Sequence, residues 1–300
     1  HLLSRRQRQM CIRDRPKAYL NELMMDDNSG QPSAKEVFDT TPYTILVVDD
    51  NPDMTDFLKR TFEGYFKRII IAGDGVEALQ LVRSHVPDII VSDVMMPRMN
   101  GYKLCKTIKE DINISHIPVI LLTARDDRQS QISGYKNGAD GYLSKPFEVE
   151  MLMELIRNRL KNREYTKKRY LNAGLIPTPE ESTISLTDET FLIKLNSIIQ
   201  ENIDNTNLGI QFICQEVGLG RSSLYNKLKA LTGMGANEYI SKLRIEKAIT
   251  LISGTDMPFS EIAEKTGFTT PSYFSTAFKQ YTGETPSQYK ERKKKGLADK

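Results

Sequence analysis

Two apolar stretches of the chain end in aspartate, and these carboxylates are well placed to do chemistry. Residues 43–48 lead into Asp49 and Asp50, and residues 88–92 lead into Asp93. Such runs predict strands buried on both faces, and if the strands are neighbours in a parallel sheet, the three carboxylates meet at one edge. Like charges at close range raise one another's pKa, whereas a hard divalent cation prefers oxygen ligands, so the cluster predicts a Mg²⁺ site.

Two further apolar runs deliver a hydroxyl and an ammonium to the same edge. Residues 117–122 lead into Thr123, and residues 139–144 lead into Lys145. Open α/β sheets bind ligands at the carboxyl ends of their strands. Each residue alone could be a helix cap or a turn residue. Together the five side chains suit phosphoryl transfer to a carboxylate.

The segment from about Tyr43 to Leu160 resembles the receiver domain of two-component response regulators over its whole length. The acidic pair, the lone aspartate followed by Met96-Pro97 and Gly101, the Thr123-Ala124 pair and the Lys145-Pro146-Phe147 run occur in the order and at the separations usual in that family. The resemblance implies a domain that is phosphorylated by a histidine kinase and is not itself an enzyme beyond assisting that transfer.

The resemblance also implies residue roles. Asp93 would accept the phosphoryl group from a phosphohistidine. Mg²⁺ would be bound by Asp50, Asp93 and the backbone carbonyl of Met95, with Asp49 acting through water. Lys145 would pair first with the carboxylates and then with the phosphoryl oxygens.

Two further residues would relay the change. Thr123 would donate its hydroxyl to a phosphoryl oxygen, and its movement would let Tyr142 turn inward as a switch. The implied result is a shift between two packings that favours a homodimer. A phosphatase that forms an aspartyl-phosphate is a distant alternative, because it needs a second aspartate where Met95 stands.

Strands alternate with amphipathic helices through this region, which predicts an α/β doubly wound, five-stranded parallel sheet of the flavodoxin-like kind. The expected strands are residues 44–48, 68–72, 88–92, 117–122 and 140–143, and the expected helices are residues 53–63, 75–85, 101–111, 126–137 and 147–161.

The rest of the chain predicts an all-α domain with an internal repeat. Asp188 is the expected N-cap of a first helix, over residues 188–202. Residues 213–233 return about 50 residues later as residues 262–283, each copy giving a helix, a turn at a glycine and a second helix. This is helix-turn-helix spacing, and residues 237–253 between the copies predict one long helix.

The region from Asp188 to Arg292 resembles the DNA-binding domain of the AraC family of transcription factors. Gly267-Phe268 and the runs at residues 273–279 and 282–289 carry the resemblance in the second unit. The second helix of each unit should enter a major groove of double-stranded DNA. Leu224, Leu228, Phe274 and Phe278 should then be core residues, because each pair is spaced four apart.

The predicted DNA contacts fall into two groups. Some polar residues should face base edges, and basic residues should contact phosphates, although for any one basic residue a solvated surface is an equal alternative. The base-edge group is Arg221, Ser222, Tyr225, Asn226, Ser272, Ser275 and Thr276, and the phosphate group is Lys227, Lys229, Arg244 and Lys279.

Composition limits the remaining options. The net charge of the 300 residues is only +3, so a nucleic-acid surface must be local. No apolar run reaches the length of about 18 residues that predicts a membrane span. The scattered cysteines lack metal-ligand spacing and fit a reducing cytoplasm. The expected order is a disordered segment and linker at 1–42, the receiver at 43–161, a linker at 162–187, the DNA-binding domain at 188–296 and a tail at 297–300.

We therefore expect a cytoplasmic, phosphorylation-dependent transcription regulator, with RNA polymerase as a further partner. Residues 1–15 are similar to translated adapter sequence, with a disordered basic arm as the alternative. Residues 16–20 are similar to the sequence that follows the ATP-binding domain of some hybrid sensor kinases. The alternative is thus the C-terminal part of a hybrid histidine kinase tethered to the inner membrane, with intramolecular transfer to Asp93.

Overall fold

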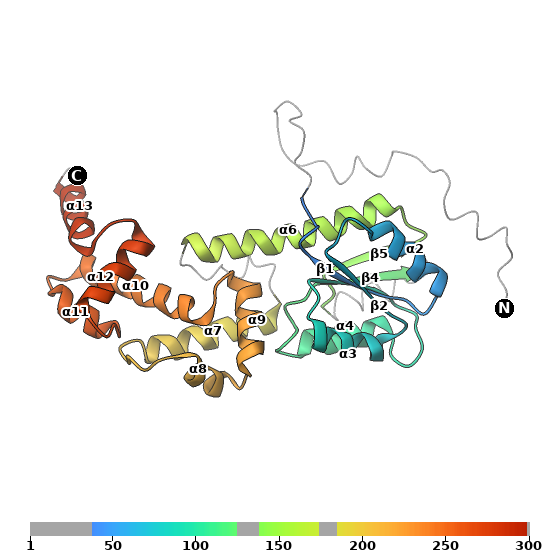
Figure 1. Ribbon diagram of the computed structural model, residues 1–300, viewed down its shortest axis with the longest axis horizontal. Helices are drawn as coiled ribbons and strands as arrows, with labels where there is room; N and C mark the ends of the chain where they lie inside the picture. Colours follow the sequence, from blue (N-terminus) through green and yellow to red (C-terminus); the bar gives the residue numbers. More distant parts are fainter. Residues whose placement is uncertain (1–37, 125–137, 174–184, 299–300) are drawn as a thin grey trace, which may run out of the picture. The chain divides into compact units, whose positions relative to one another are not determined.

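The computed structural model describes residues 38–124, 138–173 and 185–298 (Figure 1). The chain forms two compact units, one made mainly of residues before Asn162 and the other mainly of residues after it. Across these described ranges, no helix combines the length and the apolar character needed to cross a membrane.

The first unit is an α/β fold built on a five-stranded, all-parallel sheet with strand order β2-β1-β3-β4-β5. The predicted fold class is therefore confirmed. The strands are β1 (Thr44–Val48), β2 (Arg68–Ala72), β3 (Ile89–Asp93), β4 (Val119–Ala124) and β5 (Gly141–Lys145), and the helices are α2 (Pro52–Phe62), α3 (Gly75–His85), α4 (Gly101–Glu110) and α6 (Val149–Ala173).

Helices cover both faces of this sheet, α2 and α6 on one face and α3 and α4 on the other (Figure 1). Ile45 and Val91 pack in one cluster with Leu58 of α2 and Ile156 of α6. The intervening strand residues, such as Leu46, are also fully buried. Burial on both faces explains why these strands are continuous apolar runs rather than alternating ones.

One helix of the first unit is longer than the expected residues 147–161. Helix α6 continues to Ala173, so the first part of the expected linker, residues 162–173, is helical. The charged side chains in this stretch are good helix formers, and nothing in it breaks a helix. The helix predicted at residues 126–137 lies outside the described residues.

The second unit is entirely helical in its described residues, in agreement with the predicted class. Its first helix begins at Leu186, and the N-cap is Ser185 rather than the predicted Asp188, because the Ser185 hydroxyl accepts a hydrogen bond from the Asp188 backbone N–H at 3.2 Å. The helices are α7 (Leu186–Glu201), α8 (Ile210–Val217), α9 (Arg221–Thr232), α10 (Ala236–Gly254), α11 (Phe259–Lys265), α12 (Pro271–Thr282) and α13 (Pro286–Ala298).

Helix α10 belongs to two hydrophobic cores. Its first half, including Tyr239 and Leu243, packs with α7, α8 and α9, whereas its second half, including Ala248 and Ile252, packs with α11, α12 and α13. Figure 1 shows α10 running from one group of helices to the other. Each helix-turn-helix unit thus has its own core on one shared helix. The four residues predicted to be core, Leu224, Leu228, Phe274 and Phe278, are all buried.

The internal repeat is longer than the sequence suggested. The starts of α10 and α13 correspond, and each carries a side chain that accepts a hydrogen bond from a backbone N–H three residues earlier. Glu238 accepts from Gly235 at 3.3 Å, and Gln288 accepts from Thr285 at 2.9 Å. The following residue in each copy, Tyr239 or Tyr289, is buried. Each repeat is therefore two helices plus the first turn of a third.

The turn after β3 is closely packed. The Gly101 backbone N–H donates to the Val94 carbonyl at 3.0 Å. A Cβ atom added at Gly101 would lie 2.2 Å from the carbonyl oxygen of Asp93, whereas one added at Gly73 would meet only a Glu77 side-chain oxygen at 3.6 Å.

Gly101→Ala should therefore lower the free energy of unfolding of the first unit by about 1–3 kcal/mol, because backbone atoms must shift to admit the methyl group. Gly73→Ala is the matched control and should change it by less than about 0.5 kcal/mol. Hydrogen exchange of the β1 and β3 amides in the intact chain measures both values. Equal effects of the two substitutions would contradict this account of the turn.

Candidate functional site

Three carboxylates converge at the carboxyl ends of β1 and β3, as the sequence predicted. One oxygen from each of Asp49, Asp50 and Asp93 lies within 4.8 Å of the others. The two strands are hydrogen-bonded neighbours, and the strand order reverses between them, which is where open α/β sheets bind ligands. Asp49 and Asp93 are buried, whereas Asp50 is exposed, so the cluster opens to solvent on one side.

Lys145 places an ammonium between two of these carboxylates. From the end of β5, its Nζ atom lies 2.9 Å from Asp49 Oδ2 and 2.8 Å from Asp93 Oδ1. Only a long side chain can do this, because β4 lies between β5 and β3 in the sheet. The ion pairs make Lys145 part of the cluster rather than a turn residue.

The charges in the cluster alter one another's protonation. Burial raises the pKa of the Asp93 carboxyl, and the hydrogen bond and charge of Lys145 only partly offset this. Burial by itself lowers the pKa of Lys145, but its contacts with Asp93 and Asp49 raise it above the usual value overall. The ammonium therefore stays charged, while the ionised form of Asp93 remains electrostatically unfavourable.

The donor set fits a hard divalent cation. Within the described residues one ammonium pairs with two of the three carboxylates, which leaves net negative charge in the cluster, and carboxylate oxygens are the ligands that Mg²⁺ prefers. Met95 lies two residues beyond Asp93, in an exposed part of the loop. A contact from its backbone carbonyl to the cation remains a prediction.

Thr123 supplies a buried hydroxyl near the cluster. It lies in β4, paired in register with Ser144, and is 1% exposed. Within the described residues its Oγ1 atom has no hydrogen-bond partner. Such orphaned buried groups are uncommon and call for an explanation, for example an absent ligand. Tyr142, in register with Leu121, is half-buried, and its role as a switch remains a prediction.

The sequence did not identify the pair that anchors the β3–α4 loop. Asp74 caps α3 by accepting hydrogen bonds from Val76 and Glu77, and its second oxygen pairs with Arg98. Arg98 lies in the loop that follows Asp93. The Asp74-Gly75 pair before a helix signals a cap, but the partner of Arg98 could be found only from the fold.

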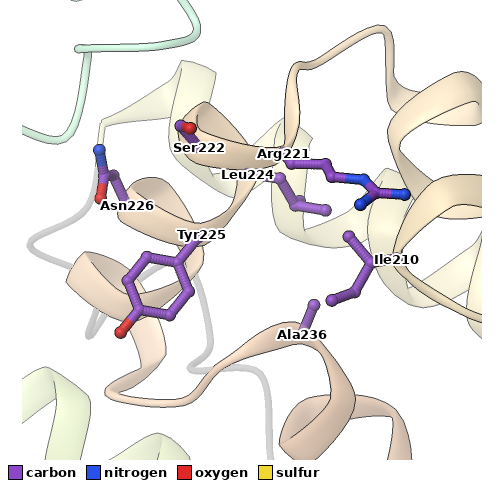
Figure 2. Close-up of a pocket in the computed structure, with 7 residues that line it drawn as sticks. All are labelled: Ile210, Arg221, Ser222, Leu224, Tyr225, Asn226 and Ala236. Carbon is purple, nitrogen blue, oxygen red and sulfur yellow. The ribbon is translucent and has the colours of Figure 1, made fainter.

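The predicted base-edge residues of the first helix-turn-helix unit share one surface of α9. Arg221, Ser222 and Tyr225 are exposed, and Asn226 is half-exposed. Together with apolar residues they line a recess of about 370 Å³ (Figure 2). The apolar residues of the recess are Ile210, Leu224 and Ala236.

Helix α12 carries the predicted DNA contacts of the second helix-turn-helix unit. Ser272, Thr276 and Lys279 are exposed, and Ser275 is half-buried. The hydroxyls of Ser275 and Thr276 donate to carbonyls one turn earlier, which leaves their lone pairs available as acceptors. Tyr273, in the first turn of α12, is 57% exposed and was not among the predicted contacts.

Two predicted phosphate contacts have other roles in the structure. Lys227 is fully buried, pairs with Asp188 and lies 5.1 Å from the centre of the Phe191 ring, so the prediction that it contacts phosphate is wrong. The face of α9 that carries it packs on α7. Arg244 donates to the backbone carbonyl of Asn205 at 2.7 Å, which links two protein segments, and its phosphate contact remains a prediction. Lys229 and Lys279 are exposed, and their phosphate contacts remain predictions.

Comparison with known proteins supports both parts of this description. A family model described as the response regulator receiver domain matches residues 45–157, and one described as a helix-turn-helix domain matches residues 213–292.

Individual relatives share one or both parts. The chain is 41% identical over 83% of its length to histidine kinase P4 of Formosa agariphila, and it spans 18% of that protein. It is 36% identical to the response regulator MprA of Mycobacterium sp. (strain KMS), covering 51% of this chain and 70% of that one. The solved receiver domain of the Francisella response regulator 1452 is 37% identical, with a TM-score of 0.37, covering 40% of this chain and 98% of that one.

Asp93→Asn should stabilise the first unit at pH 7 when divalent cations are absent. Because burial raises the pKa of Asp93 above its unfolded value, the ionised carboxylate lowers stability as the pH rises through that pKa. The gain should shrink as the pH falls through the raised pKa and should vanish below the ordinary aspartate pKa of about 4, where the carboxyl is protonated in both states. Thermal unfolding across this pH range measures the gain.

Asp53→Asn, at an exposed position in the first turn of α2, is the control and should show no such pH-dependent gain. A lower stability of Asp93→Asn at pH 7 would show that its ion pair with Lys145 outweighs the cost of burial.

Proposed function

Because this chain belongs to the response regulators, we propose that it is a transcription regulator whose binding to DNA is controlled by phosphorylation of Asp93. The observation that carries the proposal is the cluster of three carboxylates and Lys145 at the switch point of the sheet. The matches to a receiver domain and a helix-turn-helix domain in the same chain support a link from phosphorylation to DNA binding.

The transfer step uses the groups in this cluster. A carboxylate oxygen of Asp93 attacks the phosphorus of a phosphohistidine on a partner histidine kinase, and the bond from phosphorus to the imidazole nitrogen breaks as the acyl phosphate forms. Mg²⁺ held by Asp50, Asp93 and the Met95 carbonyl, with Asp49 acting through water, would supply neutralising charge for the phosphoryl oxygens. Lys145 already lies 2.8 Å from Asp93 and can pair with one of those oxygens.

The conformational response begins at Thr123. Its buried hydroxyl, which has no partner in the described part of the chain, can donate to a phosphoryl oxygen on Asp93. Movement of Thr123 in β4 would make room for Tyr142 of the adjacent β5 to turn inward. The new packing favours a homodimer, which brings two DNA-binding units onto neighbouring sites and raises avidity without new contacts to DNA.

The DNA contacts come from α9 and α12. Arg221, Ser222, Tyr225 and Asn226 are proposed to face base edges in one major-groove segment, and Ser272, Ser275 and Thr276 in the next. We add exposed Tyr273 to the second group, because an aromatic ring can make apolar contact with the methyl group of thymine. Lys229 and Lys279 are proposed to bind phosphates, and contact with RNA polymerase would follow on the bound DNA.

A second candidate has one specific observation in its favour. The match to histidine kinase P4 covers 83% of this chain and 18% of that protein, which fits a sensor kinase that carries a receiver and a DNA-binding domain. Transfer to Asp93 would then be intramolecular. Coding sequence for a histidine-kinase core that ends near residue 16 would establish this arrangement, and a start codon at Met24 or Met25 would exclude it.

Beryllofluoride with Mg²⁺, which mimics a phosphoryl group, should tighten binding of the chain to one site enriched from a random DNA pool. The increase should reach about tenfold or more, because paired units bind with higher avidity. Fluorescence anisotropy at fixed salt measures the change. EDTA or Asp93→Asn should abolish the increase, and equal affinity with and without the mimic would rule out control of DNA affinity by Asp93.

Arg221→Ala and Lys229→Ala should differ in kind. Loss of Arg221 should cost about 1–3 kcal/mol at the base pair that it contacts and relax specificity there, whereas loss of Lys229 should weaken binding to all sequences and reduce the salt slope by about 1. Lys194→Ala, at an exposed position on α7, is the control. Unchanged specificity in Arg221→Ala would remove α9 from base recognition.

A further inference from the structure

The two helix-turn-helix units touch at a point away from their shared helix. Gly267 lies in the turn between α11 and α12, and a Cβ atom added there would lie 2.3 Å from the carbonyl oxygen of Ile203. Ile203 lies in the segment between α7 and α8 and is buried. The turn of the second helix-turn-helix unit thus lies so close to the backbone of the first helix-turn-helix unit that only glycine fits there.

Arg244, in the middle of α10, makes further interactions at this contact. Its Nη2 atom donates to the Asn205 carbonyl at 2.7 Å, and its guanidinium lies 6.0 Å from the centre of the Phe268 ring. A Cβ atom at Gly267 would also lie 2.8 Å from Arg244 Nη2. The Arg244 side chain therefore contacts the first helix-turn-helix unit at Asn205 and the second helix-turn-helix unit at Gly267 and Phe268.

The contact adds a constraint that α10 alone does not provide. A single helix fixes the separation of two groups packed at its ends, but small changes in bending and in side-chain packing still let one group rotate relative to the other. A second attachment, away from the helix axis, removes this rotation. Since α9 and α12 are packed into the two groups, their relative orientation is fixed as well.

We propose that Ile203, Asn205, Arg244, Gly267 and Phe268 form a joint that sets the orientation of α12 relative to α9, and hence the spacing between the two DNA segments that the chain reads. Arg244 and Gly267 are positioning residues in this proposal, because they act through the two recognition helices. The inference rests on the proposed binding of DNA by both helices.

The repeat provides a matched control for the joint. Gly218 occupies the corresponding turn of the first helix-turn-helix unit, and Gly218 and Gly267 both have a φ of +72°. Alanine is strained at either position for the same backbone reason. A Cβ atom at Gly218 meets nothing within 4 Å, whereas one at Gly267 collides with Ile203. The difference between Gly267→Ala and Gly218→Ala therefore reports the joint and not the strain.

A distance measurement tests the joint without DNA. Spin labels are attached to Glu216→Cys on α8 and Glu264→Cys on α11, both exposed, in a full-length chain in which Cys11 and Cys214 are replaced by Ser. Double electron–electron resonance should show a shifted or broadened distance distribution for Gly267→Ala and an unchanged one for Gly218→Ala. An unchanged distribution for Gly267→Ala, or the same change in both variants, would overturn the joint.

A second variant covers the case in which Gly267→Ala fails to fold. Arg244→Met keeps the length of the side chain but removes the donor to Asn205, and it should broaden the same distribution. Lys247→Met, at an exposed position on α10, is its control and should leave the distribution unchanged. A narrow, unshifted distribution in Arg244→Met would mean that Arg244 does not hold the units together.

Binding then tests the consequence for DNA, with the enriched site and versions whose two segments are moved apart or together by one or two base pairs. Wild type and Gly218→Ala should lose about tenfold or more when the spacing changes, whereas Gly267→Ala and Arg244→Met should bind all spacings similarly. Affinity for DNA with only one segment should be the same in all four chains. Equal spacing dependence in all of them would overturn the proposed effect on DNA, and failure to enrich any site would refute the proposed function while the distance measurement still decides the joint.

Discussion

Three carboxylates and one ammonium share a small volume at the end of a parallel sheet, and their charges do not balance. Lys145 neutralises part of the charge of Asp49 and Asp93 through two short ion pairs, whereas Asp50 is exposed and forms no ion pair within the described residues. Burial keeps the ionised form of Asp93 unfavourable. We therefore expect an added cation to stabilise the site, and we expect a charge placed on Asp93 to alter its electrostatics.

The surrounding fold maintains this imbalance. Strands β1 and β3 are buried on both faces, so they cannot separate to relieve the repulsion between the carboxylates. The β3–α4 loop is held by the pair of Arg98 with Asp74 and by the close approach of Gly101 to Asp93. Rigid packing thus keeps the carboxylates close together despite their repulsion, as in sites that are preorganised for charge.

The helical unit depends on the packing of helices rather than on a cluster of charges. Two separate hydrophobic cores hold the helices α9 and α12. They share α10, and Arg244 adds an attachment away from its axis. A buried pair between Lys227 and Asp188 binds α9 to α7; burial lowers the pKa of the Lys227 ammonium, whereas the charge and hydrogen bonds of Lys227 help to lower the pKa of the Asp188 carboxyl. The structure of this unit therefore depends on how its helices pack rather than on its net charge.

Much of the fold and the site followed from local patterns. Apolar runs that end in Asp93, Thr123 and Lys145 identified strands and placed their polar ends at one edge, because parallel strands share a direction. The repeated spacing of Leu224 and Leu228 with Phe274 and Phe278 identified the core faces of α9 and α12, because helical period depends on neighbours in sequence. These features need no knowledge of distant contacts.

Other features depended on residues far apart in the sequence, and tertiary structure alone decided them. Lys227 looks like a phosphate ligand from its neighbours, but Asp188 and Phe191 of α7 bury it. Arg98 pairs with Asp74, and Arg244 donates to the Asn205 carbonyl. The partners in each case lie so far apart in the sequence that no local pattern predicts the contact. The sequence by itself determined which segments are strands and helices and which polar residues end them, because those properties arise from local period and composition. Which charges are buried, and what each one contacts, was decided by packing between segments that the sequence keeps apart.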